Sequence, residues 1–129
     1  MKTLTDHINE ALKIGKNLSE WSAYSCQPKT KKELKEIVND RIRKQGTKCD
    51  LNDIDVSLIE DMSMLFEESE FNGDISKWNV SKAEDMSGMF YESKFNSNIS
   101  RWNIDKNCNV YDMFYRCPIK DEYKPVLPE

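Results

Sequence analysis

The segment Phe71-Asn-Gly-Asp-Ile-Ser-Lys-Trp-Asn-Val80 recurs 24 residues later as Phe95-Asn-Ser-Asn-Ile-Ser-Arg-Trp-Asn-Ile104. A period of roughly 20 to 50 residues is typical of chains whose coils bury their apolar faces by stacking on one another. The repeat therefore predicts an array of stacked coils. Because such arrays usually present binding surfaces, we expect binding before catalysis.

The repeat extends in both directions from these two copies. Steps of 24 residues carry the apolar pattern back to Leu51, Ile54 and Val56 and forward to Met113 and Phe114. The chain therefore contains three consecutive units, 47–70, 71–94 and 95–118, which is the number needed for a stable array.

Each unit divides into two halves. In the first half, as in 75–80, the last two apolar residues alternate with polar ones, which predicts a short strand buried on one face. In the second half, as in 86–90, apolar residues are spaced i, i+3, i+4, which is typical of a helical turn. We expect an α/β solenoid of short parallel strands and short helical turns, with Trp78 stacked over Trp102 in its core.

Residues 1–46 form a separate region, predicted to be a helical N-terminal cap. Leu4, Ile8 and Leu12 have the spacing of a first amphipathic helix. A second helix is predicted to begin at the capping pattern Thr30-Lys-Lys-Glu33 and to end at Gly46.

Residues 47–118 are then the repeat array, and 119–129 are a C-terminal tail rich in proline. We expect Tyr123 and Val126 in this tail to fold back as a small seal on the last coil.

Composition and charge limit the classes of function. With 38% hydrophobic residues the chain is expected to fold, and it contains no apolar run of about 18 residues that would span a membrane. The N-terminus lacks the apolar stretch of a signal peptide, so a cytoplasmic location is expected. Residues 47–129 contain nine Lys or Arg against seventeen Asp or Glu. Such an acidic array repels phosphates, and no direct nucleic-acid binding is expected.

The combination of Trp78-Asn79-Val80 with Met86-x-x-Met89-Phe90 resembles the BspA-type leucine-rich repeat family of bacterial surface proteins. The similarity covers 47–118 and includes the Phe-Asn pair that opens the second and third units. It implies a leucine-rich-repeat-like solenoid without catalytic residues or cofactors that binds proteins or acts as an adhesin. As a short three-repeat member, the chain resembles a dedicated binder carried by a phage or mobile element.

The first candidate binding surface is the exposed side of the predicted strands. Asp53, Lys77 and Arg101 occupy equivalent positions in the three units, and Asn79 and Asn103 form a neighbouring column. An alternative interpretation gives the two asparagines a structural role, bonding backbone groups between coils.

Two further sets of residues are candidates for partner contacts. Tyr91 and Tyr115 fall near outward positions, and tyrosine is enriched in protein interfaces; packing against the C-terminal tail is the alternative. Glu67 and Glu68 belong to an acidic cluster that would mimic nucleic-acid charge and block a basic enzyme groove. The alternative is a solvated face.

The sequence gives little support to catalysis or metal binding. His7 stands alone, and no Ser/His/Asp set or phosphate-binding glycine loop is present. The four cysteines, Cys26, Cys49, Cys108 and Cys117, have no C-x-x-C spacing, so free thiols are expected and no metal or cofactor.

We therefore predict a protein-protein interaction module, a dedicated inhibitor or adaptor that binds one protein partner. The alternatives are a structural or adhesive repeat fragment, an acidic nucleic-acid mimic, and a hydrolase with an unrecognised site. A homodimer formed through one end of the array is a further expectation.

Overall fold

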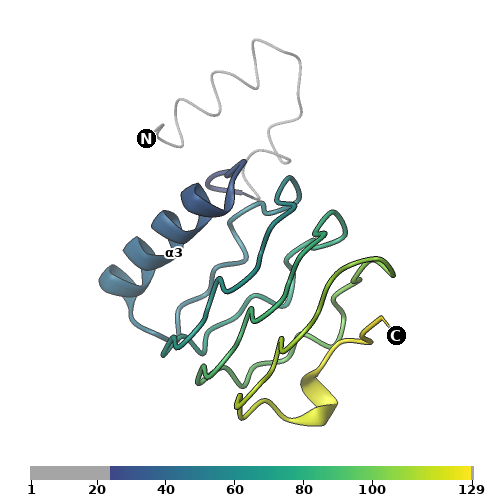
Figure 1. The fold of residues 1–129 in the computed structure, drawn as a ribbon. Helices are drawn as coiled ribbons and strands as arrows, with labels where there is room; N and C mark the ends of the chain where they lie inside the picture. Colours follow the sequence, from purple (N-terminus) through teal and green to yellow (C-terminus); the bar gives the residue numbers. More distant parts are fainter. Residues whose placement is uncertain (1–23, 129) are drawn as a thin grey trace.

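The computed structural model describes residues 24–128. Helix α3 (Lys31–Gln45) lies at one end, and the short 3-10 helix η1 (Asp121–Tyr123) lies at the other. Between them the chain winds through three stacked coils, 47–70, 71–94 and 95–118, in the order of the sequence (Figure 1).

The ends of α3 are set by local sequence, as predicted. The Thr30 side chain accepts a hydrogen bond from the backbone N–H of Glu33, and Gly46 ends the helix with a φ of 92°. Leu34 and Val38 are buried on one side of the helix and join the core of the coils. The other predicted helix, at Leu4, Ile8 and Leu12, lies outside the described residues.

The core is built from equivalent side chains of successive coils, and the predicted aromatic stacks are confirmed. The Trp78 and Trp102 rings are nearly parallel, with centroids 6.4 Å apart. The Phe66, Phe90 and Phe114 rings stack with centroid separations of 5.5 and 5.6 Å. A step of 24 residues therefore equals one turn of the coil, and large apolar side chains fill its interior.

Neighbouring coils are joined by parallel rows of backbone hydrogen bonds. In the second half of the first coil, every second N–H donates to a carbonyl oxygen of the second coil at 2.8 to 3.0 Å, and the second coil donates to the third in the same way at 2.7 to 2.9 Å. The donors in the first coil are Met62, Met64, Phe66 and Glu68, and those in the second are Met86, Gly88, Phe90 and Glu92.

The predicted α/β solenoid of strands and helical turns is wrong. Within residues 24–128 there is no strand, only four isolated parallel bridges, which pair Cys26 with Ile54, Asp50 with Asp74, Asp61 with Asp85, and Asp85 with Asn109. The second half of each coil is a series of turns and not a helix. Its alternate N–H groups donate to the next coil, so they cannot form the hydrogen bonds of a helix. The positive φ angles of Met64 and Glu68 also interrupt a right-handed helical path.

The first half of each coil stays irregular because aspartate and asparagine side chains bend it repeatedly. The Asp74 carboxylate accepts hydrogen bonds from the N–H and hydroxyl of Ser76, at 2.9 and 2.7 Å. Asn98 binds Ser100 in the same way one coil later. These Asx turns close over two residues, so no extended run is long enough to form a strand.

The C-terminal tail covers the first half of the last coil. The N–H of Ile99 donates to the carbonyl oxygen of Tyr123 at 3.0 Å, and Tyr123 and Leu127 pack against the core. Val126 is 87% exposed, so the predicted role of this residue in the seal is wrong.

Candidate functional site

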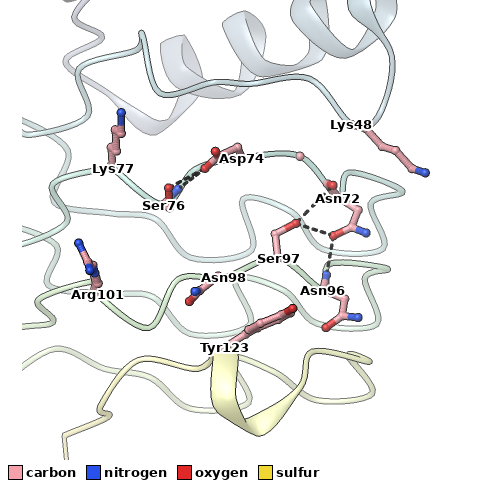
Figure 2. A pocket seen from close by; sticks show the side chains of 11 residues that line it. Lys48, Asn72, Asp74, Ser76, Lys77, Asn96, Ser97, Asn98, Arg101 and Tyr123 are labelled. Atoms are coloured by element: carbon pink, nitrogen blue, oxygen red, sulfur yellow. Dashed lines mark hydrogen bonds between the residues drawn. The ribbon is translucent and has the colours of Figure 1, made fainter.

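A polar groove runs across the first halves of successive coils. It has a volume of about 680 Å³, and its lining extends from Lys48 at the start of the first coil to Tyr123 in η1 (Figure 2). The lining residues are Lys48, Asn72, Gly73, Asp74, Ser76, Lys77, Asn96, Ser97, Asn98, Arg101 and Tyr123. A second hollow, lined by Tyr24, Asp50, Asn52, Asp53 and Lys77, shares Lys77 with it.

The floor of the polar groove requires a glycine. A Cβ added to Gly73 would lie 1.9 Å from the carbonyl oxygen of Cys49. The same oxygen accepts the N–H of Asp74 at 3.2 Å. The absence of a side chain at this position therefore lets two coils approach closely beneath the groove.

Asparagine side chains fix the groove wall to the backbone of the next coil. Asn72 Oδ1 accepts hydrogen bonds from the N–H of Asn96 at 2.7 Å and from the Ser97 hydroxyl at 2.9 Å (Figure 2). Asn96 Oδ1 in turn accepts the N–H of Lys120 at 3.0 Å. These amides hold the wall rigid, and their oxygens are already engaged.

Three cations of the groove are unpaired among the described residues. Lys77 and Arg101 lie one coil apart at one end, and Lys48 lies at the other end (Figure 2). All three are exposed, and within residues 24–128 no ion pair or hydrogen bond engages their charged groups. Among the described residues that line the groove, Asp74 is the one carboxylate. Hydrogen bonds from Asn52 and Ser76 lower the pKa of this carboxyl, so it stays charged.

The predicted column of Asp53, Lys77 and Arg101 is therefore divided. Lys77 and Arg101 line the groove, whereas Asp53 forms an ion pair with Arg41 of α3 and accepts a hydrogen bond from Ser25. Partial burial raises the pKa of Asp53, but the hydrogen bonds from Arg41 and Ser25 outweigh it and hold the pKa below its ordinary value. Asp53 thus links α3 to the first coil.

Asn79 and Asn103 are exposed and lie outside the groove lining. Asn79 closes a local turn, accepting the N–H of Ser81 at 3.1 Å and the Ser81 hydroxyl at 2.7 Å. The bonding between coils that sequence reasoning assigned to this column is made by Asn72 and Asn96. The repeated Phe-Asn pair at 71–72 and 95–96 was the available signal for it.

The two predicted tyrosines stack on a different side of the coils. The Tyr91 and Tyr115 rings lie 5.0 Å apart at an angle of 21°, and the Arg116 guanidinium sits 5.4 Å from the Tyr115 ring centre. Glu67 and Glu68 are exposed in the preceding coil. None of these side chains lines the polar groove, so the candidates form two separate surfaces.

The open end of the third coil presents a row of backbone N–H groups. By the step of 24 residues, the N–H groups of Val110, Asp112, Phe114 and Arg116 correspond to the donor rows of the other coils, and no described residue accepts them. A homodimer through this end stays a prediction.

The cysteines and candidate metal ligands of the described residues form no cluster. Residues 24–128 contain no group of three or more His, Cys, Asp or Glu arranged to hold a metal ion. The four cysteines are free, and burial raises the pKa of the Cys49 and Cys108 thiols. No described helix is long and apolar enough to cross a membrane.

One family model matches the chain, over residues 32–121, and its description is "Mycoplasma protein of unknown function, DUF285". No curated protein and no solved structure matches. The assignment to the BspA-type leucine-rich repeat family is therefore wrong. The described residues also lack the strands that a leucine-rich repeat requires.

Proposed function

Because the chain belongs to the DUF285 family, whose function is unknown, we propose a function from the geometry of the groove. The chain is a protein-interaction module, an inhibitor or adaptor that binds one protein partner through the polar groove. The observation that carries this proposal is the set of exposed cations, Lys48, Lys77 and Arg101, along a wall whose asparagine side-chain oxygens are bound internally.

Rigidity of the wall supports the proposal. Asn72, Asn96 and Asn98 are each held by hydrogen bonds to the backbone, and the close approach at Gly73 fixes the floor. A preformed surface loses little conformational entropy when a partner binds, and the free energy of binding is correspondingly more favourable. Buried aromatic stacks beneath the groove hold successive coils in register.

A second candidate function is the acidic nucleic-acid mimic. Glu67, Glu68 and Glu70 are exposed, and none of them takes part in an ion pair among the described residues. A partner of this kind would be a basic enzyme and would contact the side of the molecule away from the groove.

Site-specific photo-crosslinking tests the proposed function. A benzoylphenylalanine at Lys48 lies in the groove, and one at the exposed Lys82 lies outside it. In lysate of the source cells, the Lys48 probe is expected to form a covalent adduct with one protein. An excess of the unmodified chain should suppress that adduct. Equal adducts from both positions, or none from Lys48, would refute the proposal.

A further inference from the structure

We propose that the polar groove takes an acidic peptide segment of its partner. This inference rests on the proposed function and assigns the chemistry of the partner. It follows from the charges of the groove, from the arrangement of its cations and from what lies around them.

The charge balance of the groove is opposite to that of the chain. The chain carries a formal net charge of −4, yet the groove is lined by three cations and one carboxylate. That carboxylate, Asp74, already accepts hydrogen bonds from Ser76. Among the described residues the charge of the groove is therefore net positive, and a complementary ligand is an anion.

The arrangement of the cations favours a segment that lies along the stack of coils. Lys77 and Arg101 occupy equivalent positions in adjacent coils, each next to a tryptophan of the stack. A peptide that runs from coil to coil would thus bring its carboxylates to both Lys77 and Arg101.

Nucleic acid fits this surface less well. A phosphate backbone needs many cations along its path, and the groove offers three. The neighbouring hollow that shares Lys77 also contains the carboxylates of Asp50 and Asp53. A polyanion that continues past Lys77 would meet these carboxylates, whereas a short peptide segment confined to the groove would not.

The test uses the full chain and a fluorescently labelled (Glu-Ser)5 peptide, with (Gln-Ser)5 and an oligo-thymidine of ten nucleotides as comparison probes. Binding is measured by fluorescence anisotropy at low and at moderate salt. We expect binding of the glutamate peptide that weakens with salt, and no measurable binding of the glutamine peptide.

The variants separate a specific groove from general electrostatics. The double variant Lys77→Glu/Arg101→Glu should weaken binding of the glutamate peptide by about tenfold or more. Its matched control, Lys82→Glu/Lys106→Glu, changes net charge equally at exposed positions outside the groove and should change affinity less than about twofold.

Equal losses in the two double variants, absence of glutamate-peptide binding, or tighter binding of the oligo-thymidine would each overturn the inference. These failures are distinguishable from failure of the proposed function. If the Lys48 crosslink still forms with one protein, the groove binds a partner of different chemistry, and only the acidic-segment assignment falls.

Discussion

The indole N–H of Trp102 donates a hydrogen bond to the carbonyl oxygen of Ile75 in the preceding coil, at 2.9 Å. Trp78 repeats this bond one coil earlier, to Leu51, at the same distance. Each tryptophan is 4% exposed, so it fills the core and also links two coils. The conspicuous Trp-Asn motif is therefore structural, and the exposed Lys77 and Arg101 lie beside it in the sequence.

Truncation of this tryptophan should destabilise the whole stack. Trp78→Ala removes a buried ring together with its hydrogen bond, and we expect a loss of about 3 to 5 kcal/mol in unfolding free energy. Urea unfolding followed by circular dichroism measures it. Trp102→Phe, which keeps an aromatic ring in the core, should cost less. An unchanged unfolding midpoint for Trp78→Ala would contradict the stacked core.

The close approach at Gly73 makes a second prediction. Gly73→Ala forces a methyl group against the Cys49 backbone, and overpacking of this kind costs about 1 to 3 kcal/mol or more. Ser97 holds the equivalent position one coil later and already carries a Cβ, so Ser97→Ala is the matched control and should cost less. Thermal denaturation of both variants compares them. Equal stability of Gly73→Ala and the wild type would show that the coils are not this close.

The ion pair between Asp53 and Arg41 predicts a dependence of stability on pH. Because the folded pKa of Asp53 lies below its unfolded value of about 3.9, the pair stabilises the fold above that pH. The contribution is lost as the pH falls through the lower, folded pKa.

Unfolding free energy measured between about pH 3 and pH 7 checks this prediction. Asp53→Asn should be less stable than the wild type at neutral pH, and its stability should fall less steeply in acid. Glu67→Gln, at an exposed carboxylate without an ion pair among the described residues, serves as control and should retain the wild-type slope. Identical profiles for wild type and Asp53→Asn would exclude the ion pair as a source of stability.

The two candidate surfaces should also be separable by mutation. Glu67→Gln/Glu68→Gln removes two exposed charges away from the groove, so the yield of the Lys48 crosslink should stay within about twofold of the wild type. If crosslinking were instead abolished, the acidic side would be the binding surface and the mimic function would be favoured.

The 24-residue step predicted the stacking, the core aromatic rings and their order, because side chains that are buried in a repeat recur as apolar residues at a fixed interval. Thr30 and Gly46 predicted the ends of α3 because capping is local. The strands and helical turns were wrong because the i, i+3, i+4 spacing fits a helix and a run of turns equally. What decides between them is the direction of backbone groups such as the N–H of Met64, which bonds the next coil.

The site was predictable only in part for a similar reason. Lys77 and Arg101 were found from their equivalent positions in the repeat. The engagement of Asp53 depends on Arg41, a residue of α3 outside the repeat that only the folded chain brings close. The role of Gly73 depends in the same way on the backbone of Cys49, 24 residues earlier.

The most direct test of the central claim combines the crosslink with charge reversal. The yield of the Lys48 adduct is measured in the Lys77→Glu/Arg101→Glu background and in the Lys82→Glu/Lys106→Glu background, at equal concentrations of folded protein. If the groove cations bind the partner, the adduct is lost in the first background and retained in the second. Equal yields in the two backgrounds would contradict the assignment of the groove as the binding site.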